Sequence, residues 1–592
     1  MKSFLRIFAL ILALCSLYGC VGAAPGPSST TPTTQPAVST PEEETLYQQL
    51  FDSEHQIQLN LRMSDEELAK LQQDYEKYSS RGSKSPIYRM ADLDVTITDP
   101  EGNVATYTIE QVGVRMKGNT SRTSFYNEKD GIYNLIHFKI SFQETFDKEE
   151  YYGNDALVWS DDESREARKN RTFATLEKMD LRWNKCNDST YIREHYAFEM
   201  FRENGVLAPR TGLASMDWAG LHMGVFTICE PVDKVFLNRN LPKQQQGGDL
   251  YKCGWTSHGA DFTAVDSIGV EDEYKGQFYA YDLKTNKKKS DHSSLIQFII
   301  DLNSGNVTKE SFAELVDIDN FLSFAAVTYL LGNPDDARNN YNNFYIYFPP
   351  EGGCMLIPTD YDRCLGITHE WDPTGNAVTT DDPFGMTMAT GNHQQSPLYL
   401  YSICQGGYYM EEYARKLQEI AQSQWLTPAY FESIFTQAKA LYGDLTTPDK
   451  QFHNAADHKT TMTVDGSDGN MTFRHYTQAK LDTLNKALTK MDLSGKPQIP
   501  SSIYIRADYT NWDILPGYAM EENEDGLYQF IIPGGRVKVF DKIRNQWYGS
   551  ENLDENTTIS WETDKNTNII LADGQYLLTF DPDTLIITIT PV

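Results

Sequence analysis

The sequence predicts an α+β protein in which a large mixed body precedes a small all-β domain. Helical spacing of apolar residues between capping and terminating residues marks residues 188–205 and 316–331 as helices. Aromatic, β-prone residues on either side of a Pro- and Gly-containing turn mark residues 344–358 as a hairpin. A Gly/Pro/Ser-rich linker at residues 494–502 then precedes short strands at sandwich-like spacing, so we expect residues 503–592 to form a separate β-sandwich domain.

The N-terminus has the layout of a secretory signal. Lys2 and Arg6 precede an apolar run, residues 7–17, that is too short to span a bilayer as a stable helix. The run ends in Leu-Tyr-Gly-Cys, which is similar to a bacterial lipobox with Cys20 as the lipidated residue. Residues 1–19 are therefore predicted to be a lipoprotein signal peptide, and an ordinary secretory cleavage site shortly afterwards is the alternative.

Residues 20–46 are predicted to be a tether, because residues 21–41 carry no charge and are dominated by Pro, Ser and Thr. The main body then covers residues 47–495. The net charge of −31, with no basic stripe, argues against a nucleic-acid partner. The predicted location is the extracytoplasmic face of a bacterial membrane, which the protein contacts through its lipid anchor.

One stretch, residues 332–366, concentrates acidic and amide side chains at both ends of the predicted hairpin. Their oxygens are hard ligands that suit Mg²⁺ and leave room for phosphate oxygens. Asn340 also follows Asp335 at the spacing that separates the metal-binding Asn from the Asp base in protein kinases. The alternative is that these residues only cap turns. The candidates are Asp335, Asp336, Asn339, Asn340, Asn342 and Asn343 before the first strand, and Asp360 and Asp362 after the second.

This stretch resembles the CotH family of spore-coat, kinase-like proteins. The family signature contains N-x-D, then N-N-x-Y-x-Y, then I-P-x-D-x-D followed by a Gly. The matching residues are Asn333, Asp335 or Asp336, Asn342, Asn343, Tyr345, Tyr347, residues 357–362 and Gly366. Further segments similar to the family extend the resemblance from about residue 90 to about residue 425.

The resemblance implies an atypical kinase-like body that transfers the γ-phosphoryl group of ATP to a protein hydroxyl with Mg²⁺. Asp335 or Asp336 is implied as the base, and the choice between them stays open. Catalysis would then rest on positioning and charge neutralisation. The implied metal ligands are Asn340, Asn343, Asp360 and Asp362.

Three basic residues and one Glu are candidates for nucleotide contacts. Arg115 and Lys117 end a strand similar to the family's R-x-x-G-N-x-S segment, and Lys139 lies in a strand similar to its K-I-x-F segment. Glu230 follows another family-like strand and is expected near the adenine ring. The alternative for the lysines is that they alternate outward on half-exposed strands without a ligand.

The C-terminal domain suggests a second functional hypothesis. Trp512, Trp547 and Tyr548 resemble the exposed aromatic residues that stack on sugars in starch- and glycan-binding sandwich modules. Aromatic residues buried in an ordinary sandwich core are the alternative. The second hypothesis is therefore a non-catalytic cell-surface adhesion or glycan-binding lipoprotein on the same fold. The acidic residues at both ends of the hairpin favour the enzyme.

Six cysteines follow the predicted signal region, and none forms a C-x-x-C pair, which argues against zinc. Export would permit disulfides, and Cys354 and Cys364 bracket the returning strand of the predicted hairpin. A disulfide between these two residues and buried free thiols both remain open.

Overall fold

The computed structural model describes residues 40–592 with gaps. Cys20 and the predicted signal peptide lie outside the described residues, so lipidation stays a prediction. Helix α1 (Pro41–Phe51) begins inside the stretch predicted to be a tether, so residues 41–46 are helical. The gaps are residues 81, 119–121, 128, 130, 257–258, 368–376, 386–395, 454–459, 465–470, 492–502, 511, 513–517, 524, 542–545, 550–558, 561–567 and 583.

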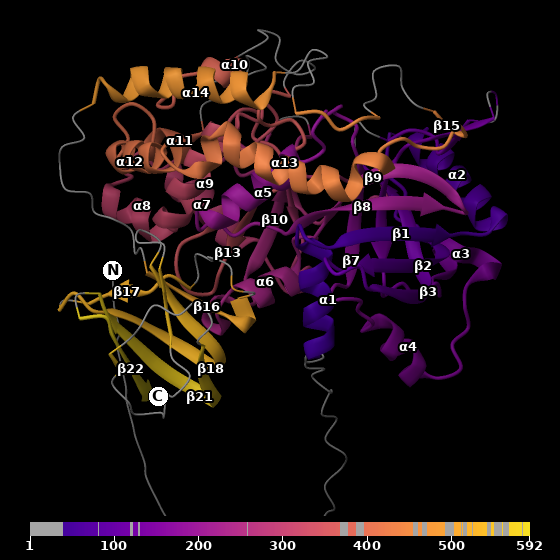
Figure 1. The fold of residues 1–592 in the computed structure, drawn as a ribbon, viewed down its shortest axis with the longest axis horizontal. Coiled ribbons are helices and arrows are strands. Elements are labelled where there is room, and N and C mark those ends of the chain that lie inside the picture. The colour runs from indigo at the N-terminus through magenta and orange to yellow at the C-terminus, as the bar shows by residue number, and fades with distance from the viewer. Residues whose placement is uncertain are drawn as a thin grey trace, which may run out of the picture. The chain divides into compact units, whose positions relative to one another are not determined.

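The first half of the body is a closed β-barrel in the order β1-β2-β3-β6-β7-β9-β8 (Figure 1). Neighbouring strands are antiparallel except where β1 pairs in parallel with β8 and closes the barrel. The strands are β1 (Gln56–Arg62), β2 (Arg89–Thr98), β3 (Val104–Lys117), β6 (His137–Ser141), β7 (Lys178–Trp183), β8 (Thr211–Trp218) and β9 (Leu221–Cys229).

The barrel interior is apolar because side chains alternate along each strand. Val112 and Val114 of β3, and Phe138 and Ile140 of β6, are fully buried in one apolar cluster. The residues between them, among them Lys139, point to the opposite face of the strands. This alternation produces a barrel with an apolar interior and with charged side chains on its outer face.

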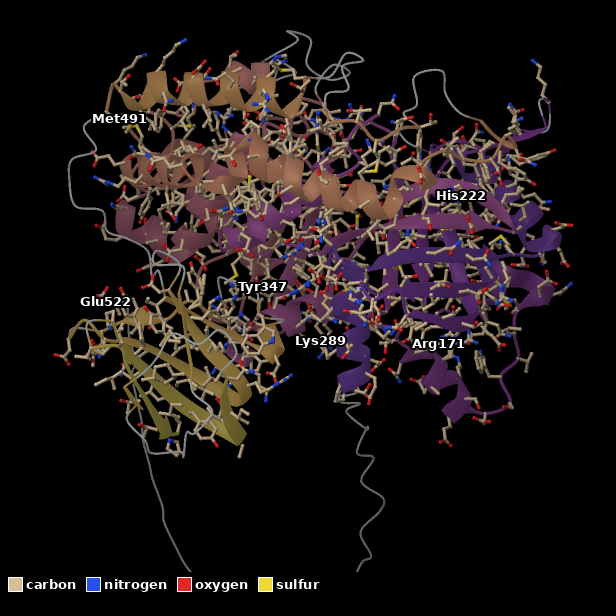
Figure 2. All side chains as sticks on the ribbon, viewed as in Figure 1. Arg171, His222, Lys289, Tyr347, Met491 and Glu522 are labelled. Carbon is tan, nitrogen blue, oxygen red and sulfur yellow. The ribbon has the colours of Figure 1, made fainter. Side chains whose placement is uncertain are left out.

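A second sheet follows, in the order β11-β12-β10-β13-β14, and it contains the predicted hairpin. Strands β13 (Phe344–Phe348) and β14 (Met355–Pro358) are antiparallel, with Phe344 opposite Pro358, which confirms the predicted hairpin. The other strands are β10 (Asp249–Cys253), β11 (Ile268–Gly269) and β12 (Tyr281–Leu283). Tyr347 of β13 is fully buried (Figure 2).

Helix α9 (Ile318–Leu331) leads into the hairpin and is buried along almost its whole length. The Asp317 side chain caps it by accepting from the backbone N–H of Asn320 at 3.0 Å. Gly332 ends the helix in the left-handed conformation, with φ of 57°, which glycine adopts without strain. The chain therefore turns sharply into the acidic stretch.

The other helices of the body cover the second sheet and flank the barrel. These helices are α2 (Asp65–Ser79), α3 (Glu149–Tyr152), α4 (Asp162–Lys169), α5 (Arg193–Glu203), α6 (Lys234–Asn240), α7 (Ser293–Leu302), α8 (Lys309–Leu315), α10 (Ala377–Thr380), α11 (Pro397–Ser402), α12 (Met410–Ala421), α13 (Pro428–Tyr442) and α14 (Phe473–Leu488). Helix α12 packs along α9, and α13 packs on α14 (Figure 1).

Short elements complete the body. Strand β5 pairs with β4 and with β15 in a small separate sheet. These strands and the short 3-10 helices are β4 (Tyr126–Asn127), β5 (Ile132–Asn134), β15 (Phe452–His453), η1 (Gly153–Asp155), η2 (Lys243–Gln245), η3 (Gln424–Leu426) and η4 (Gly443–Leu445). No described helix has the length and apolar character needed to cross a membrane.

The C-terminal strands join in one sheet in the order β16-β18-β21-β22-β20, with β17 and β19 paired to β18. The α+β prediction is thereby confirmed, whereas the sandwich architecture of the last domain stays a prediction. The elements are β16 (Ile503–Ala507), η5 (Asp508–Thr510), β17 (Glu521–Glu522), β18 (Tyr528–Asp541), β19 (Gln546–Tyr548), β20 (Ile559–Ser560), β21 (Ile569–Asp581) and β22 (Ile586–Pro591).

Of the three aromatic residues predicted to contact a glycan, Tyr548 is buried, whereas Trp512 and Trp547 are half-buried. Tyr548, predicted to face a glycan, is instead fully buried, with its ring centroid 4.9 Å from that of Phe580. The guanidinium of Arg506 lies over the ring of Trp547 at 4.2 Å, and Trp512 packs beside that ring at 6.5 Å. A sugar therefore has no access to Tyr548, because the ring is part of the core.

All six cysteines after the signal region are buried and form no disulfide, including Cys354 and Cys364. The disulfide that the sequence left open is therefore not formed.

Candidate active site

A backbone hydrogen bond joins the two chain segments at the open end of the β13–β14 hairpin. Thr359 donates its backbone N–H to the carbonyl oxygen of Asn343 at 3.1 Å, one step beyond the last strand pair. Asn343 and Asp360 both have positive φ angles, 54° and 64°. Asn and Asp tolerate this left-handed conformation better than most residues, because their short polar side chains bond locally. The hairpin thus delivers two polar loops to one place.

Asp335 is held by three side-chain amides of its own loop. Its Oδ1 accepts from Nδ2 of Asn340 at 2.7 Å and of Asn342 at 2.8 Å, and its Oδ2 accepts from Nδ2 of Asn343 at 3.1 Å. Burial raises the pKa of Asp335, and the amides of Asn342 and Asn340 oppose this rise. The negative charge of Asp360 raises the pKa further, so the two carboxylates influence each other.

Asp336 is fully buried, and its carboxylate accepts hydrogen bonds from the backbone of its own loop. Its Oδ1 accepts from the backbone N–H groups of Arg338 at 2.9 Å and of Asn339 at 2.8 Å. Burial raises its pKa to about 7. The structure therefore separates the two carboxylates that the sequence left as alternatives: Asp335 is partly exposed and oriented, whereas Asp336 organises the turn.

Asp360 and Asp362 follow β14 and differ in their partners. The Asp360 side chain is 45% exposed and forms an ion pair with Arg182 at 2.8 Å. Burial alone would raise the pKa of Asp360, but the positive charges of Arg182 and Lys117 outweigh it and lower the pKa to about 2. Oδ2 of Asp362 accepts from the Cys186 thiol at 3.1 Å. Burial and the charge of Asp360 raise the pKa of Asp362.

The outer face of the barrel presents cations near these carboxylates. Arg115, Lys139 and Asp180 stand directly opposite one another across β3, β6 and β7. Nζ of Lys117 lies 2.6 Å and Nζ of Lys139 lies 3.3 Å from the carboxylate of Asp180. Burial and the charge of Arg182 lower the pKa of Lys117. Two of the predicted phosphate-binding residues are thus brought together beside the acidic hairpin.

Sequence reasoning missed two cations of this cluster. Arg182 of β7 bonds to both Glu194 of α5 and Asp360, so it links the barrel, a helix and the hairpin. Lys252 of β10 stands opposite Tyr345 of β13. Burial and the charges of Lys84 and Lys117 lower the pKa of Lys252 to about 7. The signal for Arg182 was the alternation of charged residues along β7. Lys252 ends one of the segments that resemble the family, residues 248–252.

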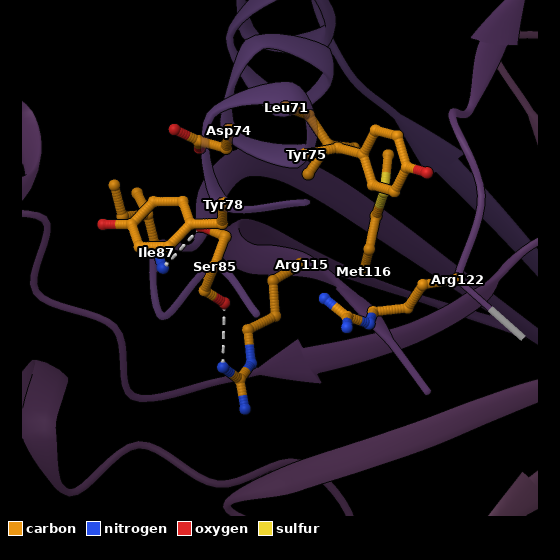
Figure 3. A pocket seen from close by; sticks show the side chains of 9 residues that line it. All are labelled: Leu71, Asp74, Tyr75, Tyr78, Ser85, Ile87, Arg115, Met116 and Arg122. Atoms are coloured by element: carbon orange, nitrogen blue, oxygen red, sulfur yellow. Dashed lines mark hydrogen bonds between the residues drawn. The ribbon is translucent and has the colours of Figure 1, made fainter. Parts of the chain in front are cut away.

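Arg115, although it stands opposite Lys139, and Glu230 both have ion-pair partners outside the Lys117–Lys139–Asp180 cluster. Arg115 pairs with Glu273 and donates to the carbonyl oxygen of Ser85 at 3.1 Å (Figure 3). It lines an open polar cavity of about 340 Å³ farther along the barrel face. Glu230 is buried against Arg239, with 2.5 Å between their charged groups, and accepts from the backbone N–H of Arg210. Both residues are therefore occupied by contacts within the protein.

The donor set at the hairpin fits a hard divalent cation. Oδ1 of Asn340 is buried and has no hydrogen-bond donor among the described residues, although its Nδ2 is fixed by Asp335. Asp360 and Asp362 add two carboxylates that repel each other. No group of three or more His, Cys, Asp or Glu side chains suited to a metal occurs in the described part of the chain. Mg²⁺ commonly uses one or two carboxylates and completes its shell with phosphate oxygens and water.

These observations define an α+β protein with an acidic hairpin set against a cationic barrel face. Residues 132–472 match the family model described as CotH kinase protein. The matched segment is more than half of the 592 residues, and the chain therefore belongs to the CotH family. The match contains the complete acidic hairpin.

The chain is also similar to the inner spore coat protein H of Bacillus subtilis (strain 168). The two are 27% identical over 184 residues, which are 30% of this chain and 48% of the relative. The chain thus spans about half the length of that relative.

Proposed function

We propose that this protein is an ATP-dependent phosphotransferase that moves the γ-phosphoryl group to a hydroxyl of a protein substrate. The proposal rests on one observation: the oriented, partly exposed carboxylate of Asp335 lies near two further carboxylates, Asp360 and Asp362, beside a strand face that carries cations. In phosphoryl transfer the protein chiefly positions the reactants and neutralises charge. This arrangement supplies groups for both tasks.

Asp335 is the residue assigned to accept the proton of the substrate hydroxyl. The three amides that bind its oxygens fix its orientation, and its raised pKa makes it a better proton acceptor than an ordinary exposed carboxylate. Asp336 is assigned a structural role, because its carboxylate is fully buried.

Asn340, Asp360 and Asp362 would hold Mg²⁺, which supplies charge neutralisation at the phosphate oxygens when bound. Lys117, Lys139 and Lys252 are assigned to the nucleotide phosphates. Lys117 and Lys139 already share the negative charge of Asp180. Arg182 holds the Asp360 carboxylate in place from the barrel side.

The protein is further proposed to be exported and anchored to the extracytoplasmic face of a membrane through lipidated Cys20. The sequence of the first 20 residues supports this part of the proposal. Metabolic labelling with a radioactive fatty acid tests it: the full chain is expected to take up label and a Cys20→Ser variant is not. Uptake by both would contradict the anchor.

Titration calorimetry with ATP and Mg²⁺ tests the site. Binding that requires Mg²⁺ in the parent protein and is at least about tenfold weaker in Asp360→Asn supports the assignment of the metal ligand. Lys243→Met changes a lysine of η2, outside the proposed site, and serves as the control. Binding of equal strength in all three proteins, with or without Mg²⁺, would refute the site.

A further inference from the structure

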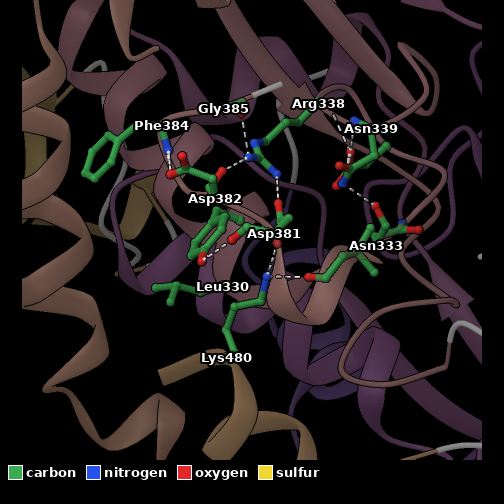
Figure 4. A network of polar contacts seen from close by, with 12 residues as sticks. Leu330, Asn333, Arg338, Asn339, Asp381, Asp382, Phe384, Gly385 and Lys480 are labelled. Atoms are coloured by element: carbon green, nitrogen blue, oxygen red, sulfur yellow. Dashed lines mark hydrogen bonds and ion pairs between the residues drawn. The ribbon is translucent and has the colours of Figure 1, made fainter. Parts of the chain in front are cut away.

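A buried charge network joins helix α14 to the loop that carries Asp335 (Figure 4). Nζ of Lys480 lies 2.8 Å from Oδ1 of Asp381, and the guanidinium of Arg338 pairs with Oδ2 of the same carboxylate. The side chains of all three residues are at most 1% exposed. A single carboxylate thus bridges two cations inside the protein.

The network continues into the acidic loop itself. The second terminal nitrogen of Arg338 donates to the carbonyl oxygens of Asp382 and Gly385, at 2.8 Å each. The backbone N–H of Arg338 donates to Asp336, the residue that organises the turn after Asp335. Arg338 therefore connects the bridging carboxylate Asp381 to the loop backbone.

Helix α14 also contacts the start of the same loop. The hydroxyl of Tyr476 donates to the carbonyl oxygen of Leu330 at 2.8 Å, at the end of α9. A methyl group added at Gly332 would lie 2.2 Å from that hydroxyl, so the two elements are in close contact. Just before α14, the backbone N–H of Met471 donates to the carbonyl oxygen of Gly366, beyond the second acidic pair.

We propose that Lys480 is a positioning residue for phosphoryl transfer: acting through Asp381 and Arg338, it holds the Asp335 loop in its working geometry. Lys480 lies beyond residue 472, where the family match ends. The working unit therefore includes α14. This inference rests on the proposed function for its consequence in catalysis, but its structural part has an independent readout.

The experiment compares Lys480→Met and Lys480→Arg in the full chain with a control, Lys486→Met, which removes an exposed lysine from the same helix. Hydrogen–deuterium exchange of residues 333–343 is measured together with kcat and KM for ATP. Lys480→Met is expected to speed exchange in this loop and to lower kcat by about tenfold or more, with KM changed by less than about twofold. Lys480→Arg, which keeps the charge, is expected to fall between Lys480→Met and the control.

Loop exchange and kcat in Lys480→Met equal to those of the control would overturn the proposal. If Lys480→Met does not fold, the hydrogen–deuterium exchange rate of residues 333–343 in Lys480→Arg tests the proposal instead. An exchange rate equal to that of Lys486→Met overturns the proposal. If the parent protein transfers no phosphate, the proposed function fails, whereas the exchange measurement still decides whether Lys480 holds the loop.

Discussion

Asn333 donates its side-chain amide to the carbonyl oxygen of Asp360 at 3.1 Å and so joins the beginning of the acidic stretch to its far end. Its side-chain oxygen accepts from the backbone N–H of Asp335 at 3.0 Å. One fully buried residue therefore contacts the backbones of both proposed working carboxylates. The Asn333 side chain therefore links the backbone positions of Asp335, the proposed base, and Asp360, the proposed metal ligand.

The first prediction concerns this amide. Asn333→Asp keeps an acceptor for Asp335 but loses the donor to Asp360, and it adds a buried negative charge. We expect transfer activity to fall by about 100-fold, because small displacements of reacting groups are costly. Circular dichroism of the variant is expected to match the parent. Unchanged activity in a folded variant would show that the two ends are held by other contacts.

The second prediction separates Asp336 from Asp335 by stability. Asp336→Ala leaves two backbone N–H groups without their acceptor in a buried turn, so we expect a loss of about 2 to 4 kcal/mol in the free energy of unfolding. Asp335→Asn is expected to cost less than about 1 kcal/mol, because the site is partly exposed. Urea unfolding measures both variants. A larger loss in Asp335→Asn would reverse the two assignments.

The third prediction concerns the buried pair of Arg182 and Glu194, whose side chains are 10% and 9% exposed. Arg182→Met alone is expected to destabilise the fold by about 3 kcal/mol, because it leaves Glu194 buried without its cation. Adding Glu194→Leu is expected to recover about 1 kcal/mol or more. Unfolding free energies of the two single variants and the double variant complete the cycle, and simple additivity would show that the pair is not coupled.

The fourth prediction is a pH dependence at His222, which joins β9 to the segment after α13. Its ring bonds to Asp217 and to the carbonyl oxygen of Leu445, at 2.7 Å each. The hydrogen bond to Asp217 raises the pKa of His222 above its ordinary value of 6.5. The stabilisation is therefore complete below the unfolded-state pKa and is lost as pH rises through the higher folded-state pKa.

We expect His222→Gln to cost about 1 kcal/mol at about pH 5.5 and clearly less at about pH 8.5. His475→Gln, which changes an exposed histidine of α14, is the matched control. Urea unfolding at both pH values measures the difference. A cost in His222→Gln that stays the same at both pH values would show that the charged form of the ring contributes nothing.

The sequence was sufficient to predict the hairpin and its acidic ends, because strand alternation, the turn and the flanking Asp and Asn residues all lie within one short stretch. It was not sufficient for the barrel, whose closure pairs Leu59 of β1 with Met216 of β8 across a long separation. No local pattern reports such pairing.

The candidate site was also predicted only in part from the sequence. Lys117 and Lys139 were selected because family-like segments marked their strands, and they lie together beside Asp180; their contact with nucleotide phosphates stays a prediction. Arg182, Lys252 and Lys480 were not found, because a charged residue on a strand or helix is usually solvent-exposed and only the folded chain shows which ones turn inward. The choice of Asp335 over Asp336 likewise depends on burial.

The most direct test of the account is transfer of labelled γ-phosphate from ATP, with Mg²⁺, to the protein itself or to a protein acceptor. The parent chain, Asp335→Asn and Asp360→Asn are compared, with Asp319→Asn as a control at an acidic residue of α9 outside the site. We expect the parent and the control to transfer label, and the two site variants to lose at least about 100-fold in rate. Equal transfer by all four proteins, or no transfer by the parent, would contradict the account.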